Sequence, residues 1–363
     1  MFAGVKQTMM KGMTSMNGST EQPEVSKNSV KTEPMTVPTA AGPVPLDSLG
    51  VTLMHEHVFL TDYEISYQFD TLPPKDDLVS LAVSKLALAY EAGVRTIVDM
   101  TVLGSGRRPD LVAAVANETP VNIIATTGLF VHGKLPLYFA MRGPNSPFGG
   151  EDDMADHFIH ELTQGIAGTE MKAGLIKCVT DAEGMTPPIE RAVRAAAWAH
   201  RQTGAPIITH THDAPNGLEQ QRILSDEGVD LTRVVIGHVD KACRNEKYLS
   251  QLVDAGSIIA FDQFGVEGFE AVGASLADRV ESVARLCAAG YAEQIVLSHD
   301  SWVYSQYVNQ AGKEAALPNH HFAYLTTEVV GHLREAGVSD SALQSMFVDN
   351  PRRILSSRGY GGY

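Results

Sequence analysis

The sequence predicts an α/β protein built as a closed (β/α)8 barrel. Two observations support this fold: eight short runs rich in β-branched residues alternate with longer segments of helical periodicity, and the units repeat every ~35 residues. An open, doubly wound sheet would show the same alternation and stays the alternative. No glycine fingerprint follows the first run, so the sequence does not favour a dinucleotide-binding fold.

The predicted elements follow the chain in order from about residue 50. The strands of this expected TIM barrel are Gly50–Val58, Val94–Thr101, Val121–Thr127, Ala173–Thr180, Pro206–Thr211, Arg233–Val239, Ser257–Asp262 and Ile295–Asp300. The helices include Asp77–Ala92, Arg108–Glu118, Pro188–Gln202, Gly217–Glu227 and Leu276–Ala289, and several end at a glycine suited to a left-handed cap. Residues 1–36 lack apolar periodicity and are expected to form a disordered N-terminal arm, which leaves 37–363 as one barrel domain.

Composition narrows the range of partners. The 363 residues carry a net charge of -15, which argues against a surface built to neutralise nucleic-acid phosphates. No uninterrupted apolar run reaches the ~18 residues that a membrane-spanning helix needs. The three cysteines, Cys178, Cys243 and Cys287, form a poor disulfide framework, so we expect a cytoplasmic protein.

Polar residues gather at the ends of the predicted strands, where a buried position is costly unless the side chain has a partner. These residues are His55, His57, Asp99, Lys177, His210, His238, Asp262 and Asp300. The C-terminal mouth of a barrel is where this fold builds its active sites. His55 and His57 are two apart on one strand, so both side chains point the same way.

Imidazole and carboxylate groups converging at one mouth predict one or two divalent metal ions. His210, His238 and Asp300 each end a later strand and would complete the ligand set. Lys177 is a poor ligand as an ammonium, but its neutral amine can react with carbon dioxide to give a carbamate that bridges two metals. A core lysine paired with Asp262 or Asp300 is the alternative.

The ordered chain resembles the phosphotriesterase family of the amidohydrolase superfamily from about Leu46 to Leu355. The resemblance rests on the segments LGVTLMHEHVFL, TGLF, IKCVTD, ITHTHD, LEQQRIL, VVIGHVD, VLSHD and VDNPRRIL. It implies that His55, His57 and Asp300 bind a buried α metal and that His210 and His238 bind a more exposed β metal. It also implies a carboxylated Lys177 between two divalent ions, with zinc expected and cobalt, manganese or iron as alternatives, and a homodimer.

Within the family, TGLF with a long third loop and the VDNPRRIL ending resemble the phosphotriesterase-like lactonases, which open N-acyl-homoserine lactones and so quench quorum sensing. Phe130 occupies a position where many lactonases carry Tyr and organophosphate hydrolases carry Trp. Gln263 departs from both patterns, because lactonases often carry Arg there and organophosphate hydrolases His. The resemblance therefore implies a lactonase with weak phosphotriesterase activity at most.

The sequence thus predicts a metal-dependent hydrolase that opens a lactone through attack of a metal-bridging hydroxide. Asp300 is expected to accept the proton, with Asp262 as a candidate member of the relay. The substrate is expected to be a small molecule with an apolar acyl chain, held by residues placed on strand-end loops: Phe130, Gln263, Phe264, Trp302 and Tyr304. The alternatives are an organophosphate or carboxylic ester hydrolase and a metal-dependent binding protein without turnover.

Overall fold

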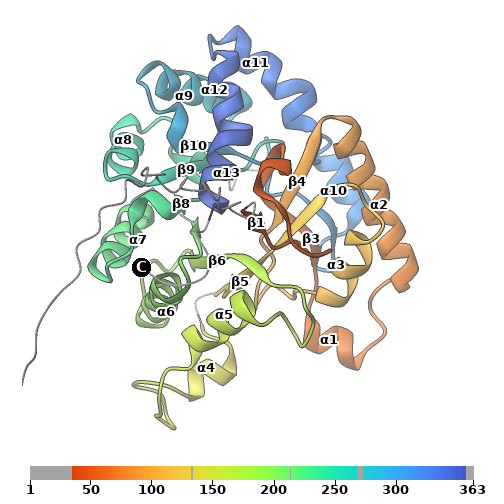
Figure 1. Cartoon of the computed structure of the whole chain (residues 1–363), viewed down its shortest axis with the longest axis vertical. Helices are drawn as coiled ribbons and strands as arrows, with labels where there is room; N and C mark the ends of the chain where they lie inside the picture. The colour runs from red at the N-terminus through yellow and green to blue at the C-terminus, as the bar shows by residue number, and fades with distance from the viewer. Residues whose placement is uncertain (1–34, 132–133, 213, 268–272, 357–363) are drawn as a thin grey trace, which may run out of the picture. The chain divides into compact units, whose positions relative to one another are not determined.

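The computed structural model describes residues 35–131, 134–212, 214–267 and 273–356. Within these residues a parallel sheet is surrounded by helices (Figure 1). Residues 1–34 of the predicted N-terminal arm lie outside the described part. At its start, the two-residue strand β1 (Thr36–Val37) pairs antiparallel with β2 (Val44–Pro45).

All eight predicted strands are present, and each pairs in parallel with the next along the chain. They are β3 (Val51–Leu60), β4 (Val94–Asp99), β5 (Asn122–Gly128), β6 (Ala173–Thr180), β7 (Ile207–Thr211), β8 (Val234–Ile236), β9 (Ile258–Phe261) and β10 (Ile295–Leu297). Strands β8 and β10 are shorter than the sequence predicts. Just beyond the two strand ends, His238 and Asp300 adopt φ of 57° and 56°, a left-handed backbone in which the pairing ladder cannot resume.

The barrel closes through a further strand segment, β11 (Trp302–Ser305), which resumes the last strand after a break at residues 298–301. Trp302 pairs in parallel with His57 on β3. Across the break, the Asp300 amide donates to the His55 carbonyl at 3.0 Å, and the His57 amide donates to the Ser301 carbonyl at 2.8 Å. The first and last strands are therefore joined, which is the closed barrel rather than the open doubly wound sheet.

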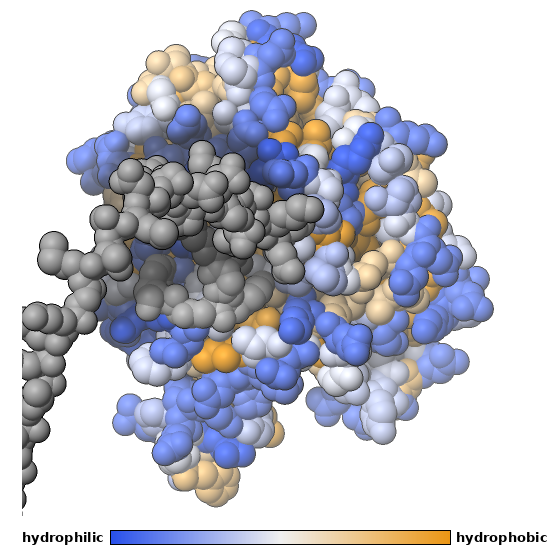
Figure 2. All heavy atoms as spheres, viewed as in Figure 1, coloured by the Kyte–Doolittle hydropathy of each residue, from blue (hydrophilic) through white to orange (hydrophobic). Residues whose placement is uncertain are grey.

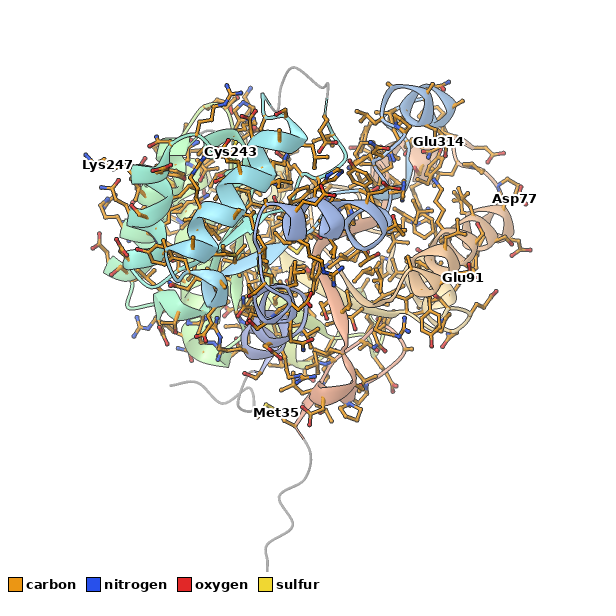
Figure 3. The ribbon with its side chains drawn as sticks, turned by 90° about the horizontal axis from the view of Figure 1, so that it is seen from above. Met35, Asp77, Glu91, Cys243, Lys247 and Glu314 are labelled. Atoms are coloured by element: carbon orange, nitrogen blue, oxygen red, sulfur yellow. The ribbon has the colours of Figure 1, made fainter. Side chains whose placement is uncertain are left out.

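The helices cover the outside of the sheet. They are α1 (Tyr63–Gln68), α2 (Lys75–Glu91), α3 (Pro109–Ala116), α4 (Leu137–Met141), α5 (Met154–Thr163), α6 (Pro187–Thr203), α7 (Ala214–Asp226), α8 (Glu246–Asp254), α9 (Leu276–Ala288), α10 (Gln310–Ala316), α11 (Val330–Glu335), α12 (Asp340–Gln344) and α13 (Asn350–Leu355). In Figure 3, Lys247 on α8 and Glu91 on α2 lie on opposite sides of the barrel, and Met35 lies at the end away from Glu314. Helix α6 ends at Gly204, which takes the expected left-handed cap with φ 71°.

The buried apolar residues form two layers. Alternate strand residues, such as Val98, Leu175 and Ile208, fill the barrel interior, and Ile354 of α13 packs into the same cluster. Their neighbours, such as Ile97 and Ile176, face outward and pack in the larger cluster that the helices share. This alternation makes Lys177, two residues after Leu175, face the barrel interior.

The visible face is mostly hydrophilic, with apolar side chains in small groups (Figure 2). Exposed large apolar residues are nevertheless present, among them Tyr67, Leu137 and Phe148. Of the helices in the described ranges, none combines the length and the apolar character that crossing a membrane requires.

Candidate metal centre

Four imidazole rings meet at the carboxyl ends of the barrel strands. His55 and His57 on β3 have ring centroids 5.6 Å apart, and the His55 and His238 rings are 4.7 Å apart. His210, at the end of β7, has its ring 4.4 Å from that of His238. Strands far apart in sequence thus bring the four predicted histidine ligands into one group.

Asp262 holds two of these rings in a fixed orientation. Its two carboxylate oxygens accept hydrogen bonds from Nδ1 of His55 at 2.9 Å and Nδ1 of His238 at 2.8 Å. The same carboxylate also accepts from the His238 backbone amide at 2.9 Å. Because Asp262 occupies each Nδ1, Nε2 is the nitrogen of each ring that can bind a cation, as in carboxylate–histidine–metal arrangements.

Asp262 was predicted to belong to a proton relay. It is wholly buried, and both of its oxygens are used by the two imidazoles. This placement favours a positioning role, in which the carboxylate fixes the ligands and not the proton of a reacting water.

Asp300 faces the Nε2 atoms from the opposite side. Its Oδ1 lies 3.2 Å from Nε2 of His57 and 3.6 Å from Nε2 of His55, while its Oδ2 lies 3.9 Å from Nε2 of His238. Lys177 completes the group, with Nζ 3.2 Å from Nε2 of His55. The six predicted ligand residues therefore surround one small volume at the mouth of the barrel.

The surroundings set the charge of these groups. Burial, followed by the charge of Lys177, lowers the pKa of His55 to about 4, and burial lowers the pKa of His210 well below its usual value. Burial alone would lower the pKa of His238, but the Asp262 carboxylate raises it. Burial opposes ionisation of Asp300, yet the neighbouring histidines, His55 first, hold its pKa well below the ordinary range.

Lys177 is 2% exposed, and burial lowers the pKa of its ammonium, although Asp300 and Asp262 oppose this shift. The described contacts do not include an ion pair of Lys177 with either carboxylate, which the alternative of a paired core lysine would require. Gly128 lies against this residue, since a Cβ at Gly128 would stand 2.0 Å from the Lys177 carbonyl oxygen. The backbone of β6 therefore passes close to β5 at the point where Lys177 enters the site.

The donor set fits divalent cations. Nε2 of His210 is buried and has no hydrogen-bond partner among the described residues. An unpaired buried polar atom is expensive unless something binds it, and a neutral imidazole nitrogen is a metal ligand. Imidazole nitrogens and carboxylate oxygens within 4.8 Å of one another in the His55, His57 and Asp300 group suit a divalent transition metal.

The turn that carries Asp300 is held by Glu56. The wholly buried Glu56 carboxylate accepts from the Ser298 hydroxyl at 2.8 Å, from the His299 amide and Nδ1 at 3.0 and 2.7 Å, and from the Ser301 amide at 2.8 Å. The closest of these contacts is with the His299 ring, which is itself wholly buried. The strained φ of Asp300 is therefore supported by four hydrogen bonds from its neighbours.

The predicted substrate residues fall into two groups. The Phe130 ring lies 5.4 Å from that of His210, so it borders the site. Oε1 of Gln263 and Nε1 of Trp302 are buried without a hydrogen-bond partner among the described residues, which leaves both atoms free for a ligand. Trp302 and Tyr304 lie on strand β11, not on a loop as predicted, because the last barrel strand resumes after its break.

Phe264 was predicted to contact the substrate, and this prediction is wrong. Its side chain is 0% exposed and belongs to the outer core cluster. The guanidinium of Arg279 lies 5.9 Å from its ring centroid. The residue packs the loop after β9 against α9 and has no surface left for a ligand.

Sequence reasoning missed several groups that support the site. Thr101 binds Nδ1 of His57 through its hydroxyl at 2.7 Å, and Asp99 in turn accepts from that hydroxyl at 2.6 Å. The signal available was the position of Thr101, two residues after Asp99, the last residue of β4. Asp181 and His212 also group with His210 at the ends of β6 and β7, at a separation of 3.5 Å between Nδ1 of His212 and Oδ1 of Asp181.

Comparison with known proteins agrees with this geometry. The model of the phosphotriesterase family matches residues 35–355. A phosphotriesterase homology protein of Mycobacterium tuberculosis is 44% identical over 323 residues, covering 88% of this chain and 98% of its own. An aryldialkylphosphatase of Saccharolobus solfataricus is 35% identical over 311 residues, covering 85% and 95%.

Two solved structures share the fold. The phosphotriesterase from Mycobacterium tuberculosis superposes with a TM-score of 0.86 at 44% identity and covers 90% of this chain and 100% of its own. A structure described as molecular engineering of organophosphate hydrolysis activity from a weak promiscuous lactonase template gives a TM-score of 0.79 at 30% identity and covers 88% and 100%. The chain therefore belongs to the phosphotriesterase family and is a hydrolase of that family.

Proposed function

We propose that this protein is a lactonase that opens the ring of N-acyl-homoserine lactones with two divalent metal ions. The observation that carries the proposal is the convergence of His55, His57 and His238 on Asp300, with buried Lys177 beside them. His55, His57 and Asp300 would hold one ion, His210 and His238 the other, and a carbamate formed on Lys177 would serve both. When bound, the ions would lower the pKa of a water molecule and polarise the scissile carbonyl.

Asp300 is suited to move the proton. Its carboxylate is kept ionised by the histidines around it and is 25% exposed, so one oxygen can reach a water at the mouth. It takes a proton from the attacking water as the new carbon–oxygen bond forms. It then returns that proton to the ring oxygen as the lactone bond breaks, which gives the hydroxy acid.

Three residues are suited to hold the substrate. Phe130 offers an apolar ring next to His210. The free Nε1–H of Trp302 is a donor and the free Oε1 of Gln263 is an acceptor, so the two atoms match the carbonyl and N–H of an amide such as the one in an acyl-homoserine lactone. Similarity to a structure engineered from a lactonase template supports the same substrate class.

The test combines metal analysis with a lactone panel of graded acyl-chain length. We expect two divalent ions per chain and acid release that depends on them. If an apolar wall buries the acyl chain, KM should fall about fourfold per methylene, from ~0.8 kcal/mol for each methylene removed from water.

The variant Asp300→Asn should abolish acid release while the circular dichroism spectrum of the fold is retained. The matched control is Asp226→Asn, because Asp226 is 56% exposed and pairs only at the surface with Arg222. Turnover in Asp300→Asn equal to that of the control would refute the proposed proton acceptor.

A second candidate is hydrolysis of organophosphate triesters by the same ions and the same carboxylate. The name of the 35% identical relative, aryldialkylphosphatase, favours it. The ratio of kcat/KM for a long-chain lactone to that for paraoxon separates the two, and a ratio below one would favour the triesterase. Full metal occupancy without hydrolysis of either compound would instead indicate a binding protein.

A further inference from the structure

A buried arginine on α9 connects to the candidate metal centre through two carboxylates. Arg279 is 0% exposed, and its Nε donates to Oδ1 of Asp240 at 2.7 Å. Asp240 is also 0% exposed, and its Oδ2 accepts from the backbone amide of Asp262 at 3.0 Å. Asp262 then binds His55 and His238 through its side chain, as described above.

These contacts connect Arg279 to both predicted metal sites, because His55 belongs to one ligand set and His238 to the other. Each step is charge-assisted and buried, so water does not compete for it. It also bears on a strained position, since His238 has φ 57° and its amide is held by Asp262. The orientation of two ligands thus depends on where the Asp262 backbone lies, and Asp240 holds that backbone.

Arg279 further ties this network to the loop that follows β9. Its Nη1 donates to the carbonyl of Ala274 at 2.8 Å and lies 3.3 Å from Oε1 of Glu267. The ring of Phe264 packs against the same guanidinium. One side chain of α9 therefore contacts a carboxylate in the segment after β8 and three residues of the loop after β9.

A buried ion pair is weak evidence of stabilisation, because desolvation of both charges offsets their attraction. The fixed fork of a guanidinium is better explained by geometry that must be held. We propose that Arg279 and Asp240 are positioning residues that act through Asp262 to keep His55 and His238 in ligand geometry. This inference rests on the proposed metal centre and adds to it the network that sets the affinity for the ions.

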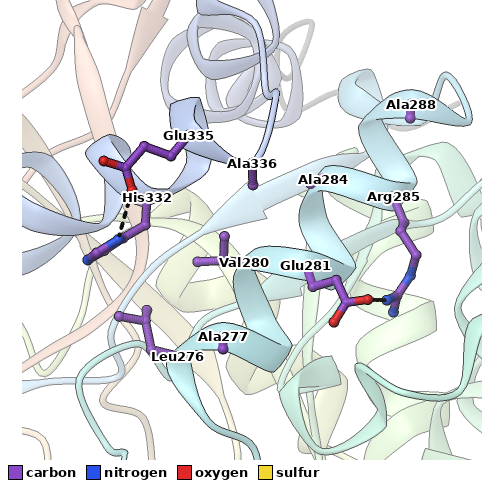
Figure 4. A pocket seen from close by; sticks show the side chains of 10 residues that line it. All are labelled: Leu276, Ala277, Val280, Glu281, Ala284, Arg285, Ala288, His332, Glu335 and Ala336. Carbon is purple, nitrogen blue, oxygen red and sulfur yellow. Dashed lines mark ion pairs between the residues drawn. The ribbon is translucent and has the colours of Figure 1, made fainter.

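The chain offers a matched control on the same helix. Arg285 lies six residues, about one and two-thirds turns, further along α9 and is 36% exposed. It pairs with Glu281 at 2.7 Å on the outer face of the helix, beside a groove of about 830 Å³ that α9 forms with α11 (Figure 4). Arg285 also contacts Glu246 at 2.8 Å and donates to the Cys243 carbonyl at 3.1 Å. Replacing it with lysine therefore changes the same chemical group and leaves the contacts among Arg279, Asp240 and Asp262 in place.

The experiment compares the metal-loaded wild type, Arg279→Lys, Asp240→Asn and the control Arg285→Lys. Zinc retention is titrated against a competing chelator, and the stability of each metal-free protein is measured by urea unfolding. Removing a residue that orients a ligand typically weakens metal affinity 10–100-fold. We expect shifts of this size for Arg279→Lys and Asp240→Asn and a shift within about twofold for Arg285→Lys.

A merely structural role would lower the urea midpoint of the metal-free variants and leave their chelator midpoint unchanged, and this result would overturn the proposal. Asp240→Asn is nearly isosteric and keeps the inference testable if Arg279→Lys fails to fold. A wild type that binds no metal would refute the metal centre itself. A wild type that binds two ions, with variants that bind them equally well, would refute only the role of Arg279 and Asp240.

Discussion

Replacing Glu56 with glutamine should weaken the closure of the barrel. The carboxylate accepts four hydrogen bonds, three at Oε1 from Ser298 and His299 and one at Oε2 from the Ser301 amide, in a wholly buried position. Glutamine has one acceptor oxygen, so its NH2 group must face a donor at the other position. A buried donor without a hydrogen-bond partner costs about 1–3 kcal/mol, and loss of the negative charge weakens the remaining hydrogen bonds. We therefore expect the unfolding free energy to fall by about 2–4 kcal/mol.

The assay is equilibrium urea unfolding of the metal-free protein, followed by circular dichroism, so that metal binding does not contribute. The control is Glu314→Gln, since Glu314 is 58% exposed and pairs with Lys85 at the surface, where such a pair contributes less than about 1 kcal/mol. An unfolding free energy for Glu56→Gln within error of the control would show that the four bonds do not hold the turn. The same variant should also bind metal more weakly, because Asp300 lies within that turn.

Three further predictions concern other parts of the fold. Gly128→Ala should lower the unfolding free energy by about 3 kcal/mol or more, because Gly128 has φ 120° and the new Cβ would stand 2.0 Å from the Lys177 carbonyl oxygen. The control Gly204→Ala is also left-handed but meets open space, so it should cost only about 1–2 kcal/mol. Equal urea midpoints for the two variants would contradict this prediction. Burial lowers the pKa of Lys313 from 10.5 to about 8, so between these pH values the unfolded chain binds more protons than the folded one. The unfolding free energy of the wild type should therefore rise relative to that of Lys313→Met as the pH rises from 8 to 10.5. A difference between the two proteins that stays constant over this range would refute the burial argument. Ser275→Ala removes the capping box of α9 and should lower the unfolding free energy by about 1 kcal/mol. A thermal midpoint equal to that of the wild type would contradict this prediction.

Much of the fold follows from periodicity. The eight apolar runs were sufficient to predict the strands, because a strand buried on both faces shows a continuous apolar signature. The strand ends were harder to predict, because the chain just beyond β8 and β10 takes a left-handed backbone at His238 and Asp300, which neither residue type indicates. The resumption of the last strand at Trp302 followed from closure against β3, a long-range pairing that local sequence does not contain.

In the candidate site too, strand positions predicted some residues, while others are brought together only by the fold. Their positions at the ends of predicted strands grouped Lys177 and His210 at one mouth, and the structure brings Lys177 next to His55 and His210 next to His238. The contacts of Arg279 with Asp240 could not be predicted from strand positions, because Arg279 lies on a helix and meets Asp240 only in the folded chain. A hint was present in α9, where Arg279, Val283 and Leu286 share the buried face at helical spacing. An arginine on such a face needs a buried partner, which the sequence does not identify.

The seam between β3 and the β10–β11 segment also sets when the centre can be completed during synthesis. Glu56 and Ser298, which meet across the seam, are 242 residues apart in the chain. At ~5–20 residues per second, a ribosome takes on the order of ten seconds or more to travel that distance. Throughout this interval the nascent chain displays the paired imidazoles of β3 without the carboxylate of the final strand. Under the proposed metal site, stable loading with metal would therefore follow synthesis of nearly the whole polypeptide, because the last strand to emerge both closes the barrel and brings Asp300 to the histidines of β3.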